Sequence, residues 1–145
     1  MHHHLVLRII SKLLIPPILL YGLYVQFHGD FGAGGGFQAG VIIAAAFVLF
    51  ALVYDLTPLQ RVLPPALLRT LMAAGVLIYA GTGLYSLFRG YNYLDYAALA
   101  HNPEHGQHLG IFLVEFGVGL TVASVMIGIF IAFAERPPTI EDKDW

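Results

Sequence analysis

Four stretches of this sequence are each apolar over about 20 residues, the length that an α-helix needs to cross a bilayer core about 30 Å thick. They cover residues 5–27, 37–54, 68–88 and 109–134, with proline, glycine and asparagine residues between them. A chain that crosses lipid must satisfy its backbone polar groups internally, as a helix does. The sequence therefore predicts an all-α integral membrane protein, with residues 1–145 forming one domain of four transmembrane helices.

The composition argues against several other classes of protein. The chain is 58% hydrophobic and only 11% charged, whereas soluble domains have about 25% charged residues. Its net charge is −2, so no basic excess indicates a nucleic-acid partner. It has no cysteine, which excludes disulfides and thiolate metal sites. We find no nucleophile–base pair and no cofactor motif, and we predict that the chain is not an enzyme and carries no cofactor.

The distribution of lysine and arginine predicts the orientation in the membrane, because cytoplasmic loops carry an excess of both residues. With the N-terminus inside, Arg89 alone falls on the outer side. The other six basic residues lie on or near the inner side: Arg8, Lys12, Arg61, Arg69, Arg136 and Lys143. We therefore predict that both termini are cytoplasmic, including a charged tail at residues 135–145.

The segment HGDFGAGGGFQAG, residues 28–40, joins the first two apolar stretches. A phosphate-binding loop follows a strand and ends in Gly-Lys-Ser/Thr, and neither feature is present here. Glycine instead permits the chain to reverse tightly between two neighbouring helices. We predict a glycine-rich turn, built on Gly34, Gly35 and Gly36, that opens the second helix.

Small residues continue into the second helix as Gly36, Gly40 and Ala44, spaced four apart. Such a face lets another helix approach the backbone closely, which is the usual way that helices associate in lipid. We expect Phe37 to wedge at the same interface. The partner helix of this face belongs either to this chain or to another subunit. The number of small faces in the whole sequence favours contacts of some of them with other subunits over packing of all of them within the chain.

Four ionisable residues are candidates for an ion path. Glu115 lies about six residues into the last stretch, where a carboxylate is costly unless it is paired, hydrated or protonated. It could carry protons, bind a cation, pair with a basic group of a neighbour, or only hold two helices together. Lys12 lies in the first stretch and either snorkels to the interface or takes part in ion movement. His28 and Asp30 lie at the outer mouth as path residues or ordinary interfacial groups.

His101, His105 and His108 have the spacing that zinc ligands on a helix can have. Pro103 and Gly106 lie among them, and we expect these residues to interrupt a helix there. No carboxylate pattern supports a site, so we predict histidines of an interfacial loop and no metal site.

The glycine run resembles the signature of the B-type subunits of Mrp-type (Mnh or Pha) multisubunit cation/proton antiporters. In that family, Gly-His-Asn-x-Pro-Gly-Gly-Gly-Phe-x-Gly-Gly opens the second helix. The matching positions here are Gly34, Gly35, Gly36, Phe37 and Gly40, and VEFGV around Glu115 resembles the acidic residue of the family's last helix. The four-helix layout also agrees, so the resemblance covers most of the chain.

Two positions depart from the family pattern. Ala33 stands where the family has proline, and Asp30 stands where it has histidine, with His28 two residues earlier. A role tied to the family's histidine therefore does not transfer to this chain.

The resemblance implies a small subunit of a Na⁺/H⁺ antiporter in a bacterial or archaeal cell membrane. It implies other membrane subunits as partners, including large antiporter-like ones, together with lipids, monovalent cations and protons. On this interpretation the chain supports assembly and lines part of an ion path near Glu115. The alternatives are a scaffold subunit without ion contact, or the equivalent subunit of a membrane-bound hydrogenase or respiratory complex.

Overall fold

The computed structural model describes residues 3–29 and 34–136, and residues 3 and 4 by their backbone alone. This part of the chain is helical, without strands. The element order is α1 (His3–His28), α2 (Gly36–Tyr54), α3 (Leu56–Val62), α4 (Pro65–Phe88), the 3₁₀ helix η1 (Tyr96–Leu99) and α5 (Pro103–Ala134). Four of these helices, α1, α2, α4 and α5, are long and apolar enough to cross a membrane, as the sequence predicts.

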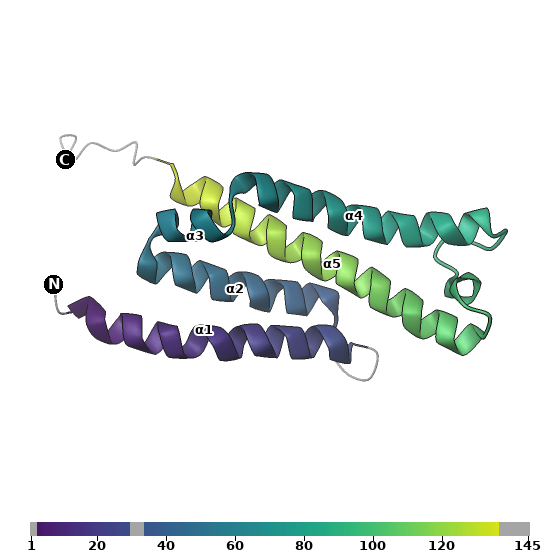
Figure 1. Cartoon of the computed structure of the whole chain (residues 1–145), viewed down its shortest axis with the longest axis horizontal. Helices are drawn as coiled ribbons and strands as arrows, with labels where there is room; N and C mark the ends of the chain where they lie inside the picture. Colours follow the sequence, from purple (N-terminus) through teal and green to yellow (C-terminus); the bar gives the residue numbers. More distant parts are fainter. Residues whose placement is uncertain (1–2, 30–33, 137–145) are drawn as a thin grey trace, which may run out of the picture.

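The four long helices form a single row in the order α1, α2, α5, α4 (Figure 1). Each helix contacts its neighbour in the row, and α1 meets α5 only at a few positions. The start of α1 and the end of α5 lie at one end of the bundle, together with α3. The end of α1 and the start of α2 lie away from that end, and η1 lies farther along the bundle, beside the start of α5.

The last helix begins earlier than we predicted, and this corrects the interpretation of the histidines. α5 starts at Pro103, whose missing N–H costs nothing at the first helical position. The Asn102 side chain accepts a hydrogen bond from the Glu104 backbone N–H at 3.1 Å and caps the helix. Gly106 is helical too, so His105 and His108 lie on a helix and not in a loop.

The largest cluster of buried apolar side chains lies at the end of the bundle where α3 sits. Leu59 of α3 has no exposed surface and packs with Leu68 of α4 and Ile127 of α5. Helix α3 was not predicted, because a seven-residue helix containing Pro58 gives no long apolar signal in the sequence. Proline is tolerated there because it lies in the first turn.

Helix α1 is the most exposed of the four. Only 11% of its apolar stretch is buried within the chain, compared with 33% for α2 and for α5. The helix runs through Pro16 and Pro17 without a break in its assignment. Most of its apolar side chains are therefore left uncovered by the rest of the described chain.

Candidate functional site at the glycine-rich turn

Glu115 of α5 points its carboxylate at the backbone that joins α1 to α2. The carboxylate occupies the space that a side chain would fill at Gly29, and a Cβ at Gly35 would come within 2.8 Å of Glu115 Oε1. Both glycines lie near the break between the helices, where the backbone is not helical. The acid is only partly exposed, so the turn and α5 form a small enclosure around it.

The turn needs glycine for two separate reasons. Gly34 has a φ of 135°, a backbone conformation that other residues rarely adopt. Gly36, the first residue of α2, lies directly against the backbone carbonyl of Glu115, and a Cβ there would overlap that oxygen. This contact fixes the position of the Glu115 backbone on α5 relative to the first turn of α2.

The face of small residues on α2 lies against α5 of the same chain. A Cβ at Gly40 would stand 2.7 Å from the Gly119 carbonyl oxygen and 2.9 Å from the Val122 Cβ. Gly36, Gly40 and Ala44 are all buried. Phe37, by contrast, is 62% exposed, so it lies on the outer side of α2 and remains available to lipid or a neighbouring subunit.

The other ion-path candidates have different surroundings. His28 stacks on Tyr24 with ring centroids 5.0 Å apart, at the end of α1 that leads into the turn. Lys12 is exposed and lines a shallow depression with Phe50 and Tyr54. That places Lys12 toward the opposite end of α2 from Glu115, so the structure does not bring these two groups together. Asp30 lies outside the described residues.

Gln26 was not among the ion-path candidates predicted from the sequence. Its side chain lies one helical turn along α5 from Glu115, on the side away from the glycine-rich turn. It is only 6% exposed, and its Nε2 has no hydrogen-bond partner among the described residues. Its amide lies over Gly119 of α5, whose Cβ would overlap Gln26 Oε1. A lone glutamine in an apolar helix gives no periodic signal, and its burial depends on which face α1 turns toward α5.

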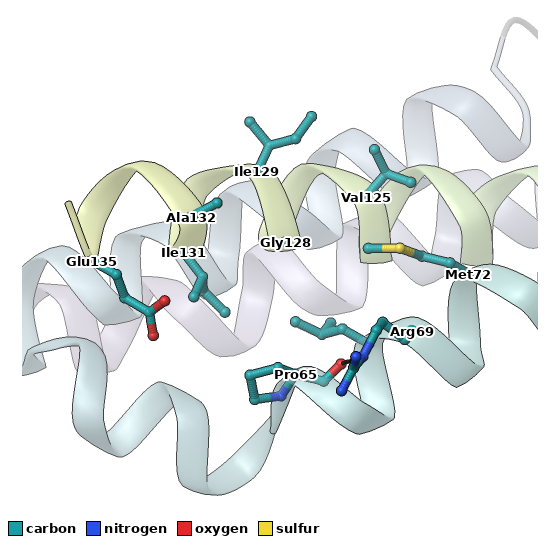
Figure 2. Close-up of a pocket in the computed structure, with 10 residues that line it drawn as sticks. Pro65, Arg69, Met72, Val125, Gly128, Ile129, Ile131, Ala132 and Glu135 are labelled. Atoms are coloured by element: carbon teal, nitrogen blue, oxygen red, sulfur yellow. Dashed lines mark hydrogen bonds between the residues drawn. The ribbon is translucent and has the colours of Figure 1, made fainter.

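Several cavities border α5. One, of about 250 Å³, is lined by side chains of α1, α2, α4 and α5, including Gln26 and Ser124. A larger one, of about 600 Å³, lies between the start of α4 and the end of α5 (Figure 2). Arg69 and Glu135 stand near Pro65 at its edge, and the other lining residues are apolar or glycine. The larger cavity does not adjoin Glu115, so it does not belong to the candidate site.

The described residues contain no group of three histidine, cysteine or acidic side chains that could hold a metal ion. Outside the four long helices, Tyr96 of η1 packs on Gly110 of α5. Burial raises the pKa of the Tyr96 phenol above its usual value, with a smaller Coulombic contribution from Tyr79. Tyr96 therefore stays neutral at ordinary pH and serves packing at this end of the bundle.

Comparison with known proteins identifies the family of the chain. Residues 6–128 match a family model described as a domain related to the MnhB subunit of Na⁺/H⁺ antiporter. The chain is 36% identical over 132 residues to a "Putative antiporter subunit mnhB2" of Staphylococcus haemolyticus, which covers 89% of this chain and 93% of that relative. A protein of the same name from Staphylococcus aureus strain Newman is 33% identical with the same coverage.

Proposed function

This chain belongs to the family of MnhB-related subunits of Na⁺/H⁺ antiporters, and we propose that within such a multisubunit antiporter it places Glu115 on the ion path. The names of its relatives favour an antiporter over a membrane-bound hydrogenase or respiratory complex. The proposal assigns the chain no bond chemistry. Its task is to carry a charged group at a fixed depth and to hold neighbouring subunits around it.

The observation that carries the proposal is the position of the Glu115 carboxylate against Gly29 and Gly35. A carboxylate in a membrane helix costs about 3 kcal/mol at the centre of the bilayer. Non-helical backbone at membrane depth survives only inside protein or beside water. Here an acid and a non-helical turn meet, which favours a hydrated entry for protons or Na⁺ over a purely structural contact.

The surroundings that we propose follow from the exposed faces of the helices. Large antiporter-like subunits would cover part of α1 and the outer side of α2, and lipid would cover the rest. The complex would lie in the cell membrane and exchange Na⁺ for protons. No single-chain relay is expected, since this chain offers few ionisable groups across about 30 Å of lipid.

Replacing Glu115 by Gln tests the proposal. The variant keeps the size of the side chain and one acceptor oxygen, but it removes the charge and replaces the second oxygen by an NH2 donor. We expect Na⁺/H⁺ antiport in everted membrane vesicles to fall by about tenfold or more, because ionisation of the acid is then impossible. The amount of assembled complex should stay normal.

Normal antiport by a normally assembled Glu115→Gln complex would contradict the proposal and favour a scaffold role. Glu104→Gln is the matched control, since Glu104 is exposed in the first turn of the same helix. It should leave antiport unchanged, so a loss in both variants would show a general effect of charge on α5.

We also propose that both ends of the chain face the cytoplasm and that the glycine-rich turn faces out. Because the chain has no cysteine, single cysteines report orientation directly. Asn92→Cys, on the exposed connection between α4 and η1, should react with an impermeant thiol reagent added to intact cells. Thr57→Cys, in α3, should react only after the membrane is opened, and the reverse pattern would invert the proposed topology.

A further inference from the structure

We propose that Gln26 is a second polar residue that lines the ion path, one helical turn deeper in the membrane than Glu115. Water in the adjoining cavity binds its side-chain amide. This inference rests on the proposed role of Glu115. It adds a residue, a location and a ligand that neither the family resemblance nor the sequence supplied.

The first step is the depth of the amide. Gln26 of α1 precedes Gly29, just beyond the end of that helix, by three residues, and Gly119 follows Glu115 by four residues on α5. Gly29 meets the Glu115 carboxylate, while Gln26 lies over Gly119. Four residues of helix rise by about 6 Å. The amide therefore lies about one turn farther from the glycine-rich turn than the Glu115 backbone does.

The second step is the unsatisfied donor. Gln26 is 6% exposed, and its Nε2 makes no hydrogen bond within the described part of the chain. An amide without a partner is costly in an apolar environment. Apolar residues of similar size are common in membrane helices, so an amide here indicates something to bind. Water is the simplest ligand that can both fill the space and accept the bond.

The third step is the space itself. The cavity of about 250 Å³ is lined by Gln26 and by residues of α5 between Phe116 and Ile127, a rise of about 16 Å. A volume of about 15 Å³ is enough to hold one water molecule, so this cavity has room for water. Leu63 lines the same cavity, so the space reaches toward the end of the bundle where α3 and α4 meet.

A second polar group lies farther along this space. Ser124, 2% exposed, donates its hydroxyl hydrogen to the Leu120 carbonyl at 2.7 Å. Its oxygen keeps acceptor capacity for a water molecule. Glu115, Gln26 and Ser124 thus mark successive levels along α5, with apolar side chains lining the rest of the cavity. Water held at the amide extends hydration inward from the acid.

The test measures water at the cavity in the complete antiporter. Ser124→Cys supplies the chain's only cysteine, and aminoethyl methanethiosulfonate reacts with the thiolate, which forms only where water reaches the thiol. We expect the cysteine to be modified. In the Gln26→Leu background the modification should be about tenfold slower, the effect of losing one hydrogen bond to the water.

Equal rates in the two backgrounds, or no modification in either, would overturn the inference. Gly119→Ala provides a second way to move the amide, because the added methyl group would displace Gln26 Oε1. It should slow modification in the same way as Gln26→Leu. This variant keeps the test decisive if Gln26→Leu fails to assemble.

Antiport supplies an independent measurement. Gln26→Leu should lower the transport rate by about tenfold at a normal amount of complex. Gln38→Leu, which changes an exposed glutamine of α2, should not. If Glu115→Gln keeps full antiport, the role of Glu115 fails, but the labelling rates at position 124 still decide whether water binds at Gln26.

Discussion

Replacing Gly36 by Val is expected to destabilise the folded chain by roughly 3 kcal/mol, the upper range for forcing atoms into a packed core. The Cβ of the new side chain would overlap the backbone carbonyl oxygen of Glu115. A backbone atom cannot rotate away as a side chain can, so α2 and α5 would have to separate. We expect earlier unfolding in a denaturing-detergent titration and little chain in the membrane.

Gly81→Val is the matched control for this prediction. A Cβ at Gly81 meets nothing within 4 Å, and the residue is exposed within α4. The same substitution should there change stability by no more than about 0.5 kcal/mol, since only helix propensity is altered. Equal stability of the Gly36→Val and Gly81→Val chains would show that α2 and α5 do not touch at Gly36.

Gly75→Val is expected to have a comparable effect at the contact between α4 and α5. A Cβ at Gly75 would overlap Thr121 Oγ1 and lie 2.6 Å from the Gly117 carbonyl oxygen. Gly117 in turn would place a Cβ 2.8 Å from the Gly75 carbonyl oxygen. The two helices therefore meet backbone to backbone. We expect a loss of about 2–3 kcal/mol in the same detergent titration.

Two further variants separate a local clash from a general effect on α4. Ala73→Val adds similar bulk at a more open position in the same turn and should be tolerated. Thr121→Ala removes only the hydroxyl from this contact, since the Gly117 carbonyl oxygen and the Thr121 backbone nitrogen remain 2.6 and 2.9 Å from the new Cβ. Combined with Gly75→Val, it should therefore restore only part of the stability. Complete recovery would assign the whole cost to the Thr121 hydroxyl.

The parts of the fold that sequence could predict are those set by local composition. The four long helices follow from apolar length alone, and the face of Gly36, Gly40 and Ala44 follows from their spacing. Whether that face meets its own chain or another subunit was open, because spacing carries no information about the partner. The structure places it on α5 of the same chain.

The parts that sequence reasoning missed depend on tertiary context or on a local signal that was undervalued. Pro103 was interpreted as a helix breaker. Asn102 caps the helix, however, and proline is then the first helical residue, a position that it favours. Gln26 is an ordinary polar residue until packing encloses it. The contact of Glu115 with Gly29 could not be seen either, since it joins residues far apart along the chain.

The single row of helices has a geometric consequence for the antiporter. Among the described residues, the contacts between the long helices run mainly between neighbours in the order α1, α2, α5, α4, and each helix is about 10 Å across with its side chains, so the row has two broad faces. Subunits docked on opposite faces would be held apart by the thickness of this one sheet of helices. The chain would then separate these subunits, and Glu115 and Gln26 would lie within the layer of helices between them.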